Sequence, residues 1–292
     1  MGKVMKKTLV GLVDKNTGEV TPIPQGKLGV YETSFEKTDD KLERADDLFF
    51  NTFGYYYHFF YGEIINMDLE PQMIIRLMRL ACCLRLNGTG KLMFTERIPL
   101  KCTDEVLGRI LKLKERELIE TKTYLIKNNL ITINKNKEIT ISDKFIVKGK
   151  IRTKENTQNR EVTRVFENGF IDLYSQCSPR SHKKLYNLIL LLPYVNVEYN
   201  ILCKNPEEKD FEKIQPLTWK ELGECLGIDK SQVSKYKSSV WTLVINGHSC
   251  LMESSTVLGK VISVNPTLFY RGKNSVKVEH LCSLFNLCDK VR

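Results

Sequence analysis

Apolar residues recur at helical spacing in the stretch 217–240, which reads LTWKELGECLGIDKSQVSKYKSSV. Leu222 and Leu226 lie four residues apart, which predicts one apolar face on a first helix, and the hydroxyl of Thr218 is placed to cap its start. Gly227 stands where the chain must turn, a position that often needs a positive φ. A second helix follows, with inward positions at Val233, Tyr236 and Val240. The pattern predicts a helix-turn-helix.

The outward positions after this turn are short polar or cationic side chains. They are Lys230, Ser231, Gln232, Ser234, Lys235, Lys237 and Ser238. Such groups suit base edges and phosphates, as on a recognition helix. The alternative is an ordinary helical hairpin whose lysines only keep one face soluble. We expect DNA binding, with the sequence read by Ser231, Gln232, Ser234 and Lys235.

An earlier stretch repeats this pattern at an offset of 115 residues, from Thr103 to Thr218. The matching positions are Leu107 with Leu222, Gly108 with Gly223, Leu111 with Leu226, Leu113 with Ile228, Leu118 with Val233, Lys122 with Lys237 and Leu125 with Val240. Residues 139–150 then align with residues 262–273 at an offset of 123, so the second copy has eight extra residues before its last strand. The helical segments 69–86 and 182–195 precede the two copies. We predict two tandem winged helix-turn-helices.

The two copies differ on the face that would meet DNA. In the first copy Lys112 replaces the turn glycine, and the second helix exposes Lys114, Glu115, Arg116, Glu117, Glu120 and Lys122. Three carboxylates facing phosphates lower affinity unless Lys114 and Arg116 offset them. The first copy is therefore either a weaker DNA reader or a dimerisation and architectural module. Four further cations complete the expected DNA-binding set: Lys135 and Lys137 in the first wing, and Arg271 and Lys273 after the second.

These patterns predict an α+β fold, mainly α with small β-hairpins. The expected divisions are 1–47 for a β-hairpin arm and polar segment, 48–152 for the first winged-helix domain, 153–178 for a basic linker and hairpin, and 179–292 for the second winged-helix domain with a C-terminal helix. Asn168-Gly169 indicates either a hairpin or a short helix leading into the second domain. The basic linker either follows a phosphate backbone or is a solvated connector.

Aromatic residues are concentrated in 49–61, LFFNTFGYYYHFFYGEI being the surrounding sequence. Aromatic rings can stack on unpaired bases. No lysine or arginine interleaves them, as a groove for a single strand would require. We therefore expect this run to form a packing surface of the first domain or a dimer contact.

Composition narrows the class of partner. The 292-residue chain has a formal net charge of +10 and a pI near 9.0, which favours an anionic partner, either nucleic acid or an acidic membrane surface. No apolar run approaches the ~18 residues that span a bilayer. The nine cysteines are scattered without CxxC pairs, so we expect reduced thiols in a cytoplasmic protein.

Signatures of catalysis and metal binding are missing from the sequence. There is no GxxxxGK[ST] loop, and the four histidines are isolated in the sequence. No acidic pair suggests two-metal phosphoryl chemistry. His280 with Cys282 and Cys288 is the one cluster of ligand types, and its spacing does not suit zinc. We expect no enzyme, no metal and no cofactor.

Three stretches carry a resemblance to a known family: DKNTGEV, LTWKELGECLGIDKSQVSKYKSSV and SVNPTLFYRGK. Through them the chain resembles the replication proteins of low-GC Gram-positive plasmids and phages, of the RepL type. That family ends a winged helix with a similar Asn-Pro, aromatic and basic-Gly sequence. Its members are shorter and have one such domain, and two tandem copies are similar to other plasmid initiators. The resemblance covers roughly the second domain. It implies binding to origin repeats and recruitment of host replication proteins, without catalysis.

The alternative function is a phage or plasmid transcriptional regulator that blocks or recruits RNA polymerase. Both functions use the same reading head, so the residues do not separate them. The expected partners are double-stranded DNA, host replication proteins or RNA polymerase, and a second copy of the chain in a homodimer. No membrane partner is expected.

Overall fold

The structure, a computed structural model, describes residues 11–13, 20–22, 53–86, 89–94, 98–149, 151, 161–272, 278 and 280–285. The chain divides into two compact units, Met1–Asp46 and Asp47–Arg292. In the first unit β1 (Gly11–Val13) pairs antiparallel with β2 (Val20–Pro22), with Leu12 opposite Thr21. The β-hairpin expected in the arm is thereby confirmed.

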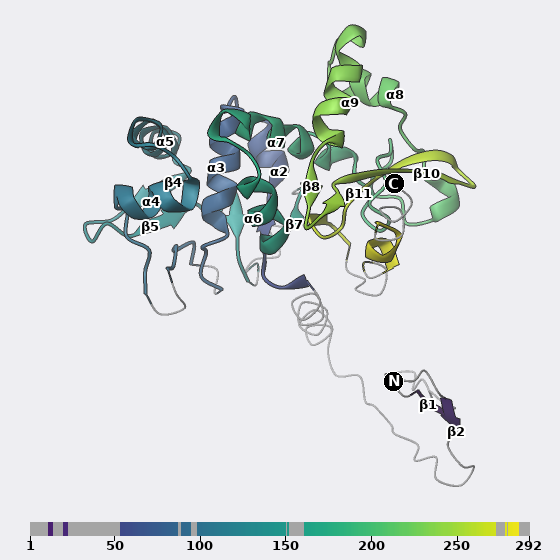
Figure 1. The fold of residues 1–292 in the computed structure, drawn as a ribbon, viewed down its shortest axis with the longest axis horizontal. Helices are drawn as coiled ribbons and strands as arrows, with labels where there is room; N and C mark the ends of the chain where they lie inside the picture. The colour runs from purple at the N-terminus through teal and green to yellow at the C-terminus, as the bar shows by residue number, and fades with distance from the viewer. Residues whose placement is uncertain are drawn as a thin grey trace, which may run out of the picture. The chain divides into compact units, whose positions relative to one another are not determined.

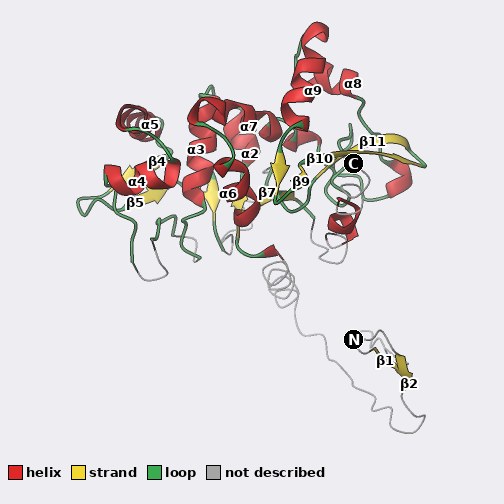
Figure 2. Ribbon diagram, in the orientation of Figure 1, coloured by secondary structure: helices red, strands yellow, loops and turns green. Residues whose placement is uncertain are grey.

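The second unit is a mixed α+β structure with small antiparallel hairpins, as the sequence predicted (Figures 1 and 2). The elements up to residue 147 are β3 (Tyr56–Phe59), α2 (Tyr61–Ile65), α3 (Pro71–Ala81), α4 (Asp104–Leu111), α5 (Glu115–Lys127), β4 (Ile131–Ile133), β5 (Ile139–Ile141) and β6 (Ile146–Val147). We call this part the first half.

The second half repeats this order with longer hairpins. Its elements are β7 (Thr163–Phe166), α6 (Glu167–Ser175), η2 (Pro179–Ser181), α7 (His182–Ile189), η3 (Leu192–Tyr194), η4 (Phe211–Lys213), α8 (Trp219–Cys225), η5 (Lys230–Gln232), α9 (Val233–Trp241), β8 (Val244–Ile245), β9 (His248–Ser249), β10 (Leu251–Thr256), β11 (Gly259–Val264) and β12 (Phe269–Tyr270). The β10–β11 hairpin pairs six residues of each strand, whereas β4–β5 pairs three. The eight extra residues of the second copy therefore lie in its hairpin region.

A four-stranded antiparallel sheet, in the order β12-β7-β3-β6, combines strands of both halves. β3 and β7 pair at its centre, with His58 opposite Arg164. Phe59 also pairs with Ile146 of β6, and Val165 pairs with Phe269 of β12, so the edge strands are equivalent. In this register His58 and Arg164 occupy equivalent positions of the two halves. A local two-fold axis that passes through this pair relates β3 to β7.

Backbone hydrogen bonds recur in the two halves and support the internal repeat. In the first half Phe60 N–H donates to Phe145 O (2.9 Å), and the equivalent bond of the second half joins Phe166 N–H to Leu268 O (3.1 Å). Likewise, Leu92 N–H donates to Ile139 O (3.0 Å) in the first half, and Leu202 N–H donates to Ile262 O (2.8 Å) in the second. The acceptors keep the offset of 123 residues that the sequence alignment gave. The repeat found in the sequence is therefore a repeat of tertiary structure.

The segment expected to be a linker differs from the prediction. Thr163–Phe166 is a central strand whose four residues are buried, and α6 spans Asn168-Gly169 where a hairpin was one of two expectations. The observed helix is the other. One hydrophobic cluster runs through both halves, and it includes Leu77 of α3 and Leu188 of α7. Residues 48–152 and 179–292 are consequently parts of one compact unit.

The aromatic run packs inside this unit. Tyr57, Phe59, Phe60 and Tyr61 are at most 1% exposed, while Tyr55 is more open. Packing rather than base stacking is therefore the role of residues 56–61, and residues 49–52 lie outside the described part. The eight described cysteines are free thiols, in agreement with the expectation for them.

Candidate nucleic-acid interface

The start of α8 is fixed by a capping box. Thr218 Oγ1 accepts the amide of Glu221 (3.3 Å), and the Glu221 carboxylate accepts the amide of Thr218 (2.9 Å). Lys204 Nζ donates to the same carboxylate at 2.6 Å. The Lys204 hydrogen bond, followed by those from Thr218, lowers the pKa of Glu221 to about 2. The helix that sequence reasoning placed after Thr218 therefore begins at Trp219.

The turn between α8 and α9 depends on two glycines. Gly227 has φ 65°, and the amide of Ile228 reaches back to the carbonyl of Gly223 (2.8 Å). A Cβ at Gly223 would lie 2.5 Å from Cγ2 of Val233, so only glycine lets α8 and α9 approach this closely. In the first half Lys112 takes the Gly227 position with φ 52°, a left-handed conformation unfavourable for lysine.

The second copy presents a free polar face around the start of α9. The side chains of Lys230, Gln232, Ser234, Lys235 and Ser238 are exposed and make no hydrogen bond or ion pair with the described residues. Lys230 to Gln232 form the short η5 turn, and α9 begins at Val233. Asp229 Oδ1 accepts the backbone amide of Ser231 (2.8 Å), which makes Asp229 the cap of this turn, and it also accepts the Ser231 hydroxyl (2.6 Å).

Lys237 lies on α9 too, but its ammonium group is engaged within the protein. Nζ is 2.6 Å from Glu253 Oε1 on β10 and 5.2 Å from the ring centres of Trp219 and Trp241. Trp219 Nε1 donates to the same carboxylate oxygen. The hydrogen bond from Lys237 is the largest cause of the lowered pKa of Glu253. Lys237 therefore joins α8, α9 and the β10–β11 hairpin, and it does not belong to the free face.

Arg271 was expected at the DNA surface, and the structure places it inside. Its side chain is 9% exposed, donates to the carbonyl of Val195 (3.0 Å), pairs with Glu207 and lies 5.7 Å from the ring centre of Tyr61. Its two terminal nitrogens are engaged by Val195 and Glu207, and its Nε is buried without a partner among the described residues, so the group is directed into the protein and away from the surface that would meet phosphates. Lys273 lies outside the described residues.

Lys148, 123 residues earlier, is the equivalent of Arg271 and is also buried. It pairs with Glu167 at 2.6 Å, and the two side chains are 7% and 8% exposed. Burial raises the pKa of Glu167 to about 7, against the opposing effect of Lys148. The basic sequence that ends each copy therefore begins with a cation directed into the protein. Sequence reasoning detected the positive charge but not its direction.

Two of the four cations expected on the helical part of the first copy are paired within that half. Arg116 pairs with Glu120 (3.1 Å), and Lys122 pairs with Asp104 (2.5 Å). The other two of these four differ: Lys112 donates to the carbonyl of Ser175 (3.3 Å), and Lys114 is exposed at the start of α5. These ion pairs reduce the positive charge that the first copy offers to a phosphate backbone.

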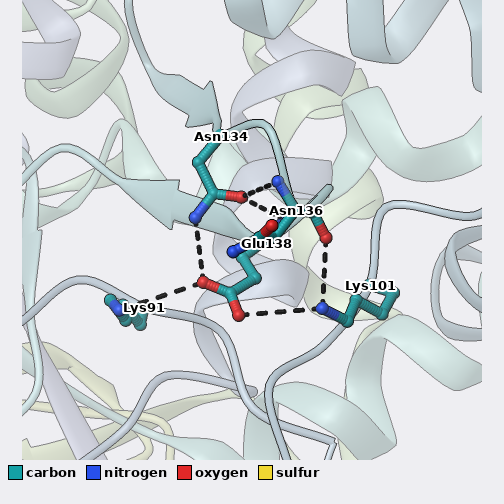
Figure 3. A network of polar contacts seen from close by, with 5 residues as sticks. All are labelled: Lys91, Lys101, Asn134, Asn136 and Glu138. Atoms are coloured by element: carbon teal, nitrogen blue, oxygen red, sulfur yellow. Dashed lines mark hydrogen bonds and ion pairs between the residues drawn. The ribbon is translucent and has the colours of Figure 1, made fainter.

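A polar network closes the β4–β5 turn (Figure 3). Asn134 Oδ1 accepts the amides of Asn136 and Glu138 (2.9 Å each), and its amide nitrogen donates to the Glu138 carboxylate (2.9 Å). Lys101 and Lys91 flank that carboxylate at 3.7 and 3.9 Å. The pKa of Glu138 is lowered, mainly by the Asn134 hydrogen bond. The network fixes a turn whose other two side chains, Lys135 and Lys137, are exposed.

The outward face of α5 carries two exposed isoleucines among its charged side chains. Ile119 and Ile126 are 48% and 44% exposed. Ile119 is the equivalent of Ser234 at the offset of 115 residues. Lys260 on β11 is an exposed cation near the hairpin tip that sequence reasoning did not select, because no local pattern marks it. The two copies therefore present chemically different faces.

No protein-family model matches this chain, and neither a curated protein nor a solved structure was found to match it. Within the described ranges, no group of three His, Cys, Asp or Glu side chains is placed to hold a metal ion. No helix in the described part of the chain has the length and apolar character needed to cross a bilayer.

Proposed function

We propose that this protein is a sequence-specific double-stranded DNA-binding protein with two tandem winged helix-turn-helices, and that its second copy is the reading head. The observation that carries the proposal is the face of Lys230, Gln232, Ser234, Lys235 and Ser238, which is exposed, polar and unpartnered among the described residues. The close α8–α9 packing and the following β10–β11 hairpin support it. The net charge of +10 agrees with a polyanionic partner.

The biological role we propose is replication initiation at a plasmid or phage origin, without catalysis by the chain itself. It rests on the resemblance of the second copy to RepL-type proteins. Mapping the fragments of source DNA that the purified chain retains tests this role. Tandem repeats beside an AT-rich stretch are the expected result. A palindrome over a promoter would instead favour a transcriptional regulator, and retention without sequence preference would contradict both.

The reading residue is tested at one base pair. Gln232→Ala should relax the preference at one position by ~1–3 kcal/mol and leave affinity for unrelated DNA nearly intact. Gln215→Ala, an exposed glutamine before α8, is the matched control and should leave the preference unchanged. An unchanged preference in Gln232→Ala would remove that side chain from the proposed reading set.

A further inference from the structure

A cavity of about 780 Å³ lies among α3, α5 and the turn η2 that leads into α7. Its lining combines both halves, with Arg76 and Glu117 from the first and Arg180 and Lys183 from the second. None of these residues belongs to the polar face of α9. An occupant of this cavity would contact both halves of the repeat at once.

Arg76 is the unusual member of this lining. The residue is 5% exposed, and its Nη1 donates to Thr121 Oγ1 at 2.8 Å. Nη1 also lies 3.8 Å from Met73 Sδ; among the described residues, Nε has no hydrogen-bond partner and no carboxylate forms an ion pair with the group. Taking a guanidinium group out of water without a counter-charge is strongly unfavourable. The missing counter-charge indicates that an anion belongs here.

A second buried group near Arg76 also lacks partners. His182 is 0% exposed, stacks against Tyr174 with ring centres 4.3 Å apart, and neither ring nitrogen has a hydrogen-bond partner among the described residues. Burial, with a smaller contribution from the charge of Arg76, lowers the pKa of His182 to about 4. The imidazole therefore stays neutral and adds no second positive charge beside the guanidinium group.

The remaining charges of the cavity are mixed. The cations are Arg76, Lys127, Arg180 and Lys183, and the carboxylates are Glu70, Glu117 and Glu120. Two of the carboxylates have other partners: Glu120 pairs with Arg116 (3.1 Å), and Glu70 accepts the side-chain amide of Gln72 (2.6 Å). Glu117 is the remaining carboxylate that could compete for Arg76.

We propose that this cavity binds a small anion, a carboxylate or a phosphate, whose oxygens accept hydrogen bonds from Arg76. Arg180 and Lys183 add charge at the same site. A guanidinium group suits both kinds of anion because its planar donors match two oxygens at once. The site is separate from the DNA-reading face, and the proposal does not depend on it.

Thermal unfolding of the full chain in sodium phosphate, sodium succinate and sodium chloride at equal ionic strength tests the proposal. An anion that binds the folded chain raises the midpoint by mass action, and the two probes separate phosphate from carboxylate ligands. Arg76→Met should weaken the apparent affinity for the anion at least about tenfold, because the loss of one charge-assisted hydrogen bond changes a dissociation constant by about that factor. In chloride, the same variant should unfold at an equal or higher temperature than the parent chain.

Matched variants distinguish the cavity from general charge effects. Arg109→Met removes an exposed arginine of α4, and Lys235→Met removes a cation of the DNA face; both should keep the anion-dependent shift. Lys183→Ala, an exposed position, should weaken the anion effect about threefold and serves if Arg76→Met does not fold. Glu117→Gln should strengthen it, because a competing charge is removed.

Three results would overturn the proposal. The first is a parent chain whose midpoint does not move in phosphate or succinate relative to chloride. The second is an anion effect of equal size in Arg76→Met, Lys183→Ala and the controls. The third is a Glu117→Gln chain that is destabilised and insensitive to anions, which would mean that Glu117 itself neutralises Arg76.

Discussion

Lys237 and Lys235 lie two residues apart on α9, and the structure predicts opposite consequences of replacing them with methionine. Methionine keeps most of the apolar stem and removes the charge. Lys237→Met removes an ion pair with Glu253 and two cation–π contacts, with Trp219 and Trp241. Lys235→Met removes a charge that has no partner among the described residues.

The expected stability loss of Lys237→Met follows from those contacts. A half-exposed ion pair contributes ~0.2–1 kcal/mol, and each exposed cation–π contact ~0.5–1 kcal/mol. Because the three share one ammonium group, the sum is an upper bound, and we expect a loss of about 1 kcal/mol. Urea unfolding followed by tryptophan fluorescence measures it directly, since the chain's two tryptophans are Trp219 and Trp241.

DNA binding supplies the second readout. Lys235→Met should lower the slope of log affinity against log salt concentration by about 0.9, the value for one phosphate contact, and leave stability within ~0.5 kcal/mol. Lys237→Met should leave the slope nearly unchanged. If Lys237→Met lowers the slope as Lys235→Met does while stability stays constant, then Lys237 serves DNA, and the reasoning from the Glu253 cluster fails.

Three further predictions concern stability. Gly223→Ala should destabilise the chain by ~1–3 kcal/mol through overpacking against Val233, and Val233→Ala should restore part of the loss in urea unfolding. Lys112→Gly should stabilise it by ~0.5–1 kcal/mol, since φ 52° suits glycine; a lower midpoint would show that the bond to Ser175 outweighs the strain. Relative to His182→Phe, the parent chain should lose stability as pH drops from 6.5 towards 4, because the unfolded chain protonates His182 before the folded chain does; the comparison isolates this effect from that of Glu167, whose raised pKa acts in the opposite direction.

Local signals in the sequence were sufficient to predict α8, α9 and the turn between them. The Thr218 cap, the Gly227 turn and the small residue at Gly223 each have a cause within a few residues, so their positions follow from spacing alone. The internal repeat could also be predicted from the sequence. Its insertions fall in the hairpins, so the offset of 115 residues between the helices after Thr103 and Thr218 is unbroken.

Long-range pairing was not accessible in the same way. Gly169 was one half of an Asn-Gly turn signal, but its Cβ would lie 2.6 Å from the carbonyl of Thr267, so the glycine permits close packing of α6. The central strand Thr163–Phe166 follows a strongly basic segment and has no alternating pattern, since all four residues are buried. Arg271 and Lys237 read as surface cations because their partners, Glu207 and Glu253, are distant in sequence.

The local two-fold axis through His58 and Arg164 has a consequence for polarity. Two identical copies related by such an axis would present the same surface in both directions along a duplex. In this chain the two equivalent helices differ. α5 exposes Ile119 and carries paired charges, whereas α9 presents a free polar face. A single chain bound to a duplex would therefore distinguish upstream from downstream, and its preferred site would have an orientation rather than a palindrome.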